Sequence, residues 1–357
     1  MSWFAQQLLN WHRESGRKDL PWQQDISPYR VWVSEIMLQQ TQVSTVIDYY
    51  LRFMQRFPKV DDLAAAPIDE VLHYWTGLGY YARARNLHSA AKTVVETHAG
   101  QLPTSQTALE SLPGIGRSTA GAIRAISMGQ SAAILDGNVK RVLTRFHAIP
   151  GYPGNTQVNQ LLWTKAQEHT PEQDAGTYCQ AIMDLGATLC TRRRYACATC
   201  PVQSRCAAFE SGEVARYPES KPKRVKPVAQ ARFYVVTLPD GTTLLEKKPP
   251  SGIWGGLWTP PERPADCTIE QFLATIGSDQ QALTRQHVGP VFRHTFTHYH
   301  LDIEPVYLYL SHAPQAITDI DQHRWVQPDN IGRGNEAIGL SAPAVKLLAS
   351  LKEPFKT

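Results

Sequence analysis

Hydrophobic residues recur with helical spacing through the first two-thirds of the chain. Ser27 is followed by Pro28, a pair typical of a helix start because serine caps the first turn and proline fits its first position. Further apolar series with a period near 3.6 predict helices at 43–57, 63–75, 82–98, 107–112, 118–128, 139–149 and 159–169. No convincing strand pattern precedes residue 230, so this part is predicted to be entirely helical.

The pattern changes after residue 216. Residues 216–227 contain three prolines and five basic residues without an apolar period, which is typical of a linker. Beyond it, two alternating runs flank the turn sequence Pro239-Asp240-Gly241 and predict a hairpin. The remaining segments predict strands at 291–297 and 299–310 and helices at 269–276 and 342–351. The C-terminal part is therefore predicted to be α+β.

Composition narrows the class of protein. The chain has 357 residues, of which 42% are hydrophobic and 19% charged, as in ordinary globular proteins. Its first residues lack the basic start and apolar core of a signal peptide, and no apolar run approaches the roughly 18 residues of a membrane span. We therefore expect a cytoplasmic protein with no membrane partner. The net charge of +4 permits a nucleic-acid partner without requiring one.

Four of the six cysteines are clustered. Cys190, Cys197, Cys200 and Cys206 fall within 17 residues. Four thiolates in a short loop can hold one [4Fe–4S] cluster, whereas zinc sites usually contain two close pairs of cysteines and this loop has only one. The spacing favours the cluster over zinc, and both remain possible from spacing alone. Cys179 and Cys267 are interpreted as buried thiols.

Two further features carry candidate chemistry. Gly114 and Gly116 stand at the mouth of a predicted helix, where backbone N–H groups could approach a DNA phosphate in a helix-hairpin-helix; an ordinary tight turn is the alternative. Asp136 precedes another helix, which it could cap, or it could face a cationic transition state. Glu35 could be a solvated residue, but Trp32 and neighbouring apolar residues make partial burial and a raised pKa plausible.

Together these features resemble the endonuclease III superfamily of DNA glycosylases, and finer motifs resemble its MutY family of adenine DNA glycosylases. The motifs are LPW at 20–22, SEIMLQQTQV at 34–43, WTGLGYYARARNL at 75–87, ILDGN at 134–138 and MDLGA at 183–187. The resemblance covers nearly the whole chain. It also strengthens the interpretation of the four cysteines as ligands of an iron–sulfur cluster.

The resemblance implies a fold and a reaction. The fold would be a mainly α N-terminal region, a six-helix barrel with a helix-hairpin-helix and an iron–sulfur module, followed by a Nudix-like α+β domain. We expect a catalytic domain at 1–215 with the module at about 186–210, a linker at 216–228 and an 8-oxoguanine-recognition domain at 229–357. The protein would be a monomer that binds double-stranded DNA containing A·8-oxoguanine or A·G mispairs. It would flip the adenine and hydrolyse its N-glycosidic bond.

The resemblance also implies roles for individual residues. Glu35 would protonate adenine at N7, and Asp136 would stabilise or transiently trap the oxocarbenium-like sugar, with Asn138 as a third catalytic residue. Around the DNA the family motifs place Arg17, Trp22, Tyr80, Ser118, Asn138 and Gln180 at the flipped nucleotide, Gln40 and Thr41 in the wedge beside the lesion, and Leu78 and Gly79 near the opposite strand. Gln23 is expected among the substrate- or DNA-binding residues, and Gly114 and Gly116 at a phosphate. Each has a plainer alternative, since Trp22 and Tyr80 could be core residues and Gln40-Thr41 could simply join two helices. Arg192, Arg193, Arg194 and Arg205 in the cysteine loop could contact phosphates or form a solvated charged face.

The C-terminal domain should bind rather than hydrolyse. A catalytic Nudix domain carries a glycine followed by a glutamate-rich helix, and the stretch after Gly256 lacks that block. Phe296-Thr297-His298 matches the family element that inspects 8-oxoguanine, which assigns Thr297 and His298 to lesion binding. His294, His298 and His300 are expected on one face of a strand, with a metal site as the rival interpretation.

Two other functions remain as alternatives. One is a bifunctional pyrimidine glycosylase and lyase like endonuclease III, which Ser118 and the C-terminal domain disfavour. The other is a non-catalytic sensor of DNA lesions, which Glu35 and Asp136 disfavour.

Overall fold

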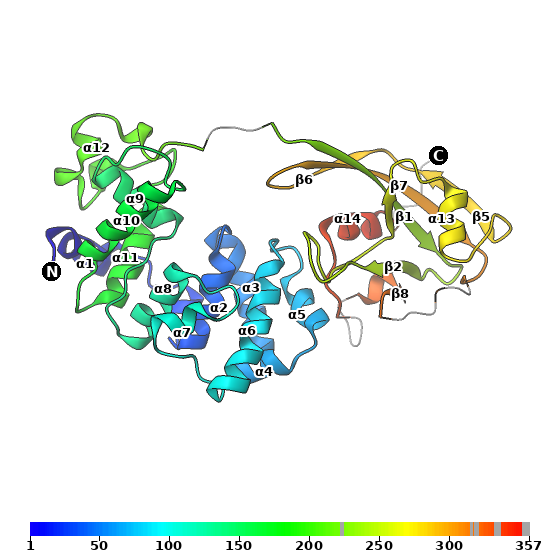
Figure 1. Ribbon diagram of the computed structural model, residues 1–357, viewed down its shortest axis with the longest axis horizontal. Helices are drawn as coiled ribbons and strands as arrows, with labels where there is room; N and C mark the ends of the chain where they lie inside the picture. Colours follow the sequence, from blue (N-terminus) through cyan, green and yellow to red (C-terminus); the bar gives the residue numbers. More distant parts are fainter. Residues whose placement is uncertain (222–224, 315–316, 318–320, 332–336, 352–357) are drawn as a thin grey trace. The chain divides into compact units, whose positions relative to one another are not determined.

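The computed structural model describes residues 1–221, 225–314, 317, 321–331 and 337–351. The chain forms two compact units, Met1–Ala65 with Asn86–Lys223 and Ala66–Arg85 with Arg224–Thr357. The first is helical and the second is built on a sheet (Figure 1). Residues 222–224 of the predicted linker lie outside the described residues. Among the described residues, no helix combines the length and apolar character that crossing a membrane requires.

The described chain is helical up to its first strand. Its α-helices are α1 (Trp3–Ser15), α2 (Pro28–Leu38), α3 (Val43–Arg56), α4 (Val60–Ala65), α5 (Ile68–Trp75), α6 (Ala82–His98), α7 (Gln106–Glu110), α8 (Arg117–Met128), α9 (Gly137–Phe146), α10 (Thr156–His169), α11 (Ala175–Thr188) and α12 (Ala207–Glu210). Short 3₁₀ helices are η1 (Pro21–Gln23), η2 (Cys197–Thr199), η3 (Gln203–Arg205) and η4 (Val214–Arg216). The prediction of a helical N-terminal part is confirmed.

The core of the helical unit forms where α1, α8, α9 and α11 meet. Leu8, Leu143, Ile182 and Leu185 are buried there in one cluster. Helix α2 packs against α8, and α11 packs against both α8 and α9. The middle of α2 and the first turn of α9 are thereby held against a common scaffold.

Local sequence explains where these helices begin and break. Ser27 caps α2 by accepting a hydrogen bond from the Arg30 N–H, and Pro28 fills the first turn, as predicted. The single helix predicted at 63–75 is wrong, since α4 ends at Ala65 and α5 begins at Ile68. Pro67 explains the break, because proline disfavours helical backbone in the residue before it. Helices α1 and α11 were not predicted.

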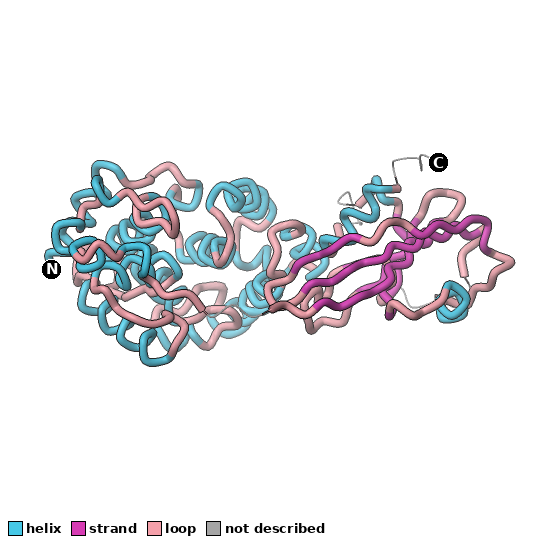
Figure 2. The backbone as a smooth tube through the Cα atoms, turned by 90° about the horizontal axis from the view of Figure 1, so that it is seen from above, coloured by secondary structure: helices cyan, strands magenta, loops and turns pink. Residues whose placement is uncertain are grey.

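The second unit contains an eight-stranded sheet (Figure 2). Its strands are β1 (Val228–Thr237), β2 (Thr243–Lys247), β3 (Trp258–Thr259), β4 (Glu262–Pro264), β5 (Leu283–Val288), β6 (Phe292–Thr295), β7 (His300–Leu310) and β8 (His323–Val326). Its further helices are α13 (Ile269–Thr275), α14 (Ala342–Ser350) and η5 (Pro328–Asn330). The main strand order is β3-β2-β1-β7-β5, with β1 and β7 parallel. The α+β prediction is confirmed.

The strand predictions were confirmed where the alternation was clear. The hairpin forms with Thr237 opposite Thr243. Strand β5 was missed because most of its side chains are exposed and its sequence does not alternate. Strand β8 was missed because it is only four residues long.

The expectation of three histidines on one strand face is wrong. His294 belongs to β6, His300 begins β7, and His298 lies in the turn between them. The Phe296 N–H donates to the Tyr299 carbonyl across that turn, which reverses the chain. His294 instead packs against the Trp254 ring.

Helix α5 and the loop after it pack with the C-terminal strands in the second unit. The Tyr81 hydroxyl donates to the Leu340 carbonyl at 3.2 Å, and the Leu340 N–H donates to the Thr76 hydroxyl at 3.3 Å. Lys247 forms an ion pair with Asp69 at 2.9 Å. The first two contacts join the WTGLGYYARARNL motif to Leu340, more than 250 positions later in the chain, and the ion pair joins α5 to the end of β2.

Candidate active site

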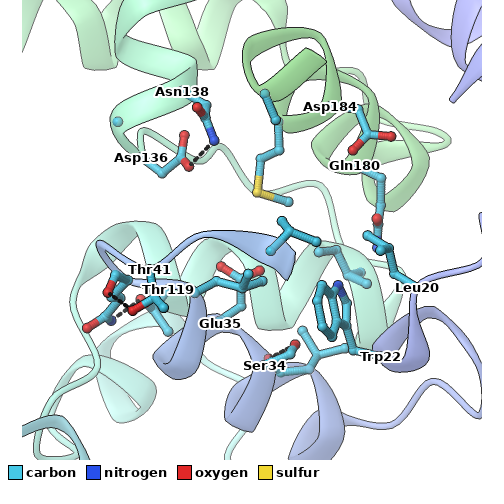
Figure 3. A pocket seen from close by; sticks show the side chains of 18 of the residues that line it. Leu20, Trp22, Ser34, Glu35, Thr41, Thr119, Asp136, Asn138, Gln180 and Asp184 are labelled. Carbon is cyan, nitrogen blue, oxygen red and sulfur yellow. Dashed lines mark hydrogen bonds between the residues drawn. The ribbon is translucent and has the colours of Figure 1, made fainter. Parts of the chain in front are cut away.

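A cavity of about 410 Å³ opens in the helical unit. Its walls come from η1, α2, α8, the start of α9 and α11 (Figure 3). The predicted site residues that line it are Arg17, Trp22, Glu35, Gln40, Thr41, Ser118, Asp136, Asn138 and Gln180. Residues far apart in sequence are therefore gathered in one place.

Glu35 enters this cavity from α2. Its neighbours Ser34 and Ile36 are buried, while Glu35 is only half-buried because its carboxyl group faces the cavity. Burial raises the pKa of Glu35 to about 8, and the nearby Asp136 carboxylate adds to the effect. At neutral pH the folded protein therefore keeps a proton on Glu35.

Asp136 enters from the start of α9 and also caps that helix. It accepts a hydrogen bond from the Val139 N–H at 2.7 Å, and the Asn138 amide lies 3.4 Å from its other oxygen. Burial raises the pKa of Asp136, whereas these hydrogen bonds and the Arg141 guanidinium oppose the rise. The cap predicted for Asp136 is confirmed, and the same carboxyl group lines the cavity.

Arg141 connects Asn138 to the cysteine loop. Its guanidinium donates to the Asn138 side chain at 2.7 Å, to the Gly186 carbonyl at 2.6 Å and to the Cys190 carbonyl at 2.7 Å. Gly186 permits this arrangement, because a side chain there would start 2.6 Å from the Cβ of Asn138. Helices α9 and α11 can thus approach closely beside the cavity.

Ser118 lies in the first turn of α8, after the glycine loop. Its hydroxyl accepts a hydrogen bond from the Leu135 N–H at 2.9 Å, next to Asp136 in the chain. Gly114 has a φ of 81°, a conformation that favours glycine, and a Cβ there would lie 2.8 Å from Asn86. Gly116 is the N-cap of α8 and nothing crowds it. The predicted turn followed by a helix is present.

Asp184 is a residue of the cavity wall to which the sequence analysis gave no role. It accepts hydrogen bonds from the Arg17 side chain at 2.9 Å and from the Arg17 backbone N–H at 2.8 Å. Burial alone would raise the pKa of Asp184, but His12 and Arg17 lower it overall. The sequence feature that could have identified Asp184 is its position four residues after Gln180, which puts both residues on the same face of α11. Asp184 fixes Arg17 in the wall.

Gln23 supports the wall without lining the cavity. Its amide donates to the Gln180 side chain at 2.6 Å and to the Arg17 carbonyl at 3.0 Å. Trp22 is buried and packs edge-to-face on Tyr50, so it is both a core residue and part of the lining. Gln40, with φ at 57°, and Thr41 form the break between α2 and α3.

The remaining predicted DNA-contact residues belong to the sheet-bearing unit. Leu78 is buried, Gly79 has a φ of 78°, and Tyr80 is half-exposed. The Tyr80 hydroxyl lies 3.5 Å from the Thr297 hydroxyl. Thr297 and His298 are exposed at the tip of the turn between β6 and β7. The cavity lining contains none of these five residues.

The four clustered cysteines line a second cavity, beside α9 and α11. Cys190, Cys197, Cys200 and Cys206 border it together with the buried Arg145. Arg145 donates a hydrogen bond to the Cys190 sulfur at 3.3 Å. Within the described part of the chain, no group of three or more His, Cys, Asp or Glu side chains is arranged to hold a single metal ion.

The arginines of the cysteine loop are on the surface. Three consecutive arginines, Arg192, Arg193 and Arg194, precede Cys197 in the chain, and all three are exposed. Arg205 is also exposed and lies over the Trp3 ring at 4.5 Å. Their roles in DNA binding stay predictions.

Comparison with known proteins places this geometry in a family. Residues 33–168 match the HhH-GPD superfamily of base excision DNA repair proteins, and residues 232–350 match the NUDIX domain. The adenine DNA glycosylase of Buchnera aphidicola subsp. Schizaphis graminum is 36% identical over 351 residues, which cover 98% of this chain and 99% of that protein. The adenine DNA glycosylase of Mus musculus is 37% identical, over 90% of this chain and 73% of that protein.

The chain belongs to the adenine DNA glycosylase family. As a member it is a base-excision-repair DNA N-glycosylase, which is a hydrolase. The sequence-based resemblance and the predicted enzyme class are therefore confirmed.

Solved structures agree on the fold of the helical part. The structure of a thermostable thymine-DNA glycosylase is 27% identical with a TM-score of 0.53, covering 58% of this chain and 95% of that one. A non-covalent endonuclease III–DNA complex gives a TM-score of 0.50 at 19% identity, covering 59% of this chain and 95% of that one. The helical unit of this adenine glycosylase family member thus has the endonuclease III fold.

Proposed function

We propose that this enzyme removes adenine mispaired with 8-oxoguanine or guanine from double-stranded DNA, and that it leaves the DNA strand intact. One observation carries the proposal: Glu35 and Asp136 meet in one cavity where burial raises the pKa of both, but hydrogen bonds from Val139 and Asn138 and the Arg141 charge oppose the rise at Asp136. Two carboxyl groups in such different surroundings suit cleavage of a glycosidic bond, in which one donates a proton and the other stabilises the positively charged sugar.

The chemistry follows from the leaving group. Adenine leaves readily only after protonation, and Glu35 holds a proton at neutral pH that it can give to N7 of a flipped adenine. The sugar then develops positive charge, which the Asp136 carboxylate stabilises. Asn138 lies against Asp136 and is held by Arg141, so it positions that carboxylate. Water completes the reaction.

The wall opposite the acids would hold the flipped base. Arg17, Trp22 and Gln180 line the cavity, and Gln23 and Asp184 fix two of them through hydrogen bonds. An adenine ring buried there would meet an aromatic face and polar donors, which is how flipped bases are recognised. Gly114 and Gly116 at the start of α8 would receive a DNA phosphate on backbone N–H groups.

The two parts of the chain would divide the work. Residues 1–215 would carry catalysis, with residues 186–210 as the cysteine module, and 216–228 would link them to a lesion-reading domain at 229–357. There, exposed Thr297 and His298 would contact 8-oxoguanine. The acidic block of a catalytic Nudix domain is absent from the sequence after Gly256, which supports binding rather than hydrolysis.

The cysteine cavity fits a [4Fe–4S] cluster. Four cysteine side chains border it, as the cluster requires, and Arg145 supplies positive charge at Cys190. Zinc would need all four sulfurs within about 2.3 Å of one ion. When bound, the cluster would hold the arginine-bearing loop in one conformation. Anaerobically purified protein should contain iron and show broad visible absorption, and zinc without iron would contradict the assignment.

One assay tests the function. Duplexes with a single A·8-oxoguanine, A·G or oxidised-thymine pair are incubated with the enzyme, and base release is followed in single turnovers. We expect adenine release from the first two and none from the third. Release of the oxidised pyrimidine with strand cleavage would instead support an endonuclease III-like activity, and binding without release would support a lesion sensor.

A further inference from the structure

Among the described residues of the predicted linker, only Lys226 has a side-chain hydrogen bond to the turn between β6 and β7. Its ammonium donates to the Phe296 carbonyl at 2.7 Å. The adjacent Pro227 carbonyl accepts a hydrogen bond from the His300 N–H at 2.9 Å. Both ends of the turn are therefore tied to the segment that enters β1.

The Phe296 ring is fixed independently. It packs against Trp254 at 5.1 Å, His294 at 4.6 Å and Tyr299 at 4.6 Å between ring centres. The ring anchors the side chain of Phe296, but it does not determine how the following peptide group is rotated. The Lys226 contact acts on that peptide group.

The Phe296 carbonyl and the Thr297 N–H belong to one planar unit and point in opposite directions. An ammonium held on the carbonyl therefore sets the direction of the Thr297 N–H and the place from which the Thr297 hydroxyl projects. Both groups are at the exposed tip of the turn. The charged donor also makes this hydrogen bond stronger than one between neutral groups.

We propose that Lys226 is a positioning residue for lesion recognition, which holds the Phe296–Thr297 peptide in the orientation that distinguishes 8-oxoguanine from guanine. This inference rests on the proposed function of Thr297 and His298. 8-Oxoguanine presents a donor at N7 and a carbonyl at C8, whereas guanine presents an acceptor and a C–H. A binding group must be fixed in direction to use such a difference.

The half-buried state of Lys226 fits this role better than a contact with DNA phosphate. Neighbouring Val225 is 97% exposed, whereas Lys226 folds back onto the turn. A phosphate contact would act on every duplex alike, because phosphates carry no sequence information. The two roles therefore differ in a measurable way.

The test compares Lys226→Met, which keeps the length of the side chain but loses the donors, with Lys226→Arg, which restores a charged donor. Single-turnover adenine release is measured with the full-length protein on A·8-oxoguanine and A·G duplexes. We expect the ratio of the two rates to fall about tenfold in Lys226→Met, the effect of one charged hydrogen bond, and to recover in Lys226→Arg. Exposed Lys221→Met, in the same linker, is the matched control and should leave both rates unchanged.

The outcomes separate the inference from the function beneath it. An unchanged ratio in Lys226→Met, beside a lowered ratio in Thr297→Ala, would overturn the role of Lys226 alone. An equal loss on both duplexes, with a weaker salt dependence, would also overturn it, in favour of a phosphate contact. If wild type shows no preference for 8-oxoguanine, or Thr297→Ala keeps it, the proposed reading turn and the role of Lys226 both fail.

Discussion

The carboxyl groups of Glu35 and Asp136 share one cavity, and the start of α9 donates hydrogen bonds to the carboxyl group of Asp136. Asp136 accepts a hydrogen bond from the Val139 N–H at 2.7 Å, which favours its carboxylate. That carboxylate in turn raises the pKa of Glu35, on top of the effect of burial. Asp136, which caps α9, therefore helps to keep Glu35 of α2 protonated.

Replacing Glu35 tests its role as the acid. Glu35→Gln keeps the shape of the side chain and loses the transferable proton, so adenine release should fall at least about a hundredfold while DNA binding persists. Single-turnover kinetics and binding to the same duplex measure the two effects. Near-normal release by this variant would rule out Glu35 as the proton donor.

The pH profile of wild type should show the same group. The pKa of Glu35 is raised to about 8, so the acid is present below that value and lost above it. The single-turnover rate should decline as pH rises through about 8. At low pH the rate should decline again as Asp136 takes up a proton. A rate that stays constant from pH 7 to well above pH 8 would contradict the assignment.

Arg141 should couple the cysteine loop to the site. Arg141→Met leaves the Gly186 and Cys190 carbonyls and the Asn138 side chain without their donor, at a cost of about 1–3 kcal/mol for the buried Gly186 carbonyl and less for the two half-buried groups. We expect lower stability and slower adenine release, measured by urea unfolding and single turnovers.

A matched arginine supplies the control. Arg124 donates to Gln130 at 2.7 Å and to Gln106 at 3.0 Å, and it does not line the cavity. Arg124→Met should lose stability but keep its rate per folded molecule. Equal rates in the two variants would show that Arg141 has no effect on the site beyond stability.

The sequence predicted the features that local chemistry determines. The cap at Ser27, the cap at Asp136 and the hairpin around Gly241 depend on a few adjacent residues, and all three formed as predicted. Pro67 is a local signal for the break between α4 and α5, but the apolar series continues on both sides of it and favours a single helix.

What the sequence could not predict depends on contacts between distant segments. Asp184 holds Arg17, 167 residues away, and nothing next to either residue announces the pair. The contact of Tyr81 with Leu340 similarly joins segments that a linear division into domains separates. The expected histidine face failed because the turn at 296–299 lies inside what the alternation suggested was continuous strand.

A pair of histidines in the helical unit should make stability fall in acid. The His147 and His169 rings stack, and their Nε2 atoms are 2.9 Å apart. Burial, then the charge of His169, lowers the pKa of His147 to about 4. Between the unfolded value of about 6.5 and that value, only the unfolded chain gains the proton, so stability is lost as pH falls through this range.

Urea unfolding at pH 7 and pH 5 measures this effect. His147→Gln removes the titrating group and should lose less stability between the two pH values than wild type does. His98→Gln, on α6 and outside the pair, is the control and should behave like wild type. The prediction fails if His147→Gln and wild type show the same pH dependence.

Ser118 should decide whether the strand is cut. A lysine at this place can attack the sugar and form an imine that leads to strand cleavage, whereas a hydroxyl cannot form an imine. Ser118 lines the cavity with Asp136, so a longer amine here would project toward the reacting sugar. Wild type should therefore give strand breaks almost only after alkali, and Ser118→Lys should give them without alkali.

The control separates the amine from the lost hydroxyl. Ser118 accepts a hydrogen bond from the Leu135 N–H, so any substitution loses about 1 kcal/mol of stability there. Ser118→Ala has that defect without an amine and should still need alkali for breaks. Strand breaks before and after alkali are compared in one time course for all three proteins. Equal yields from wild type without alkali would restore the lyase interpretation, because a nucleophile other than residue 118 would then have to be present in the cavity.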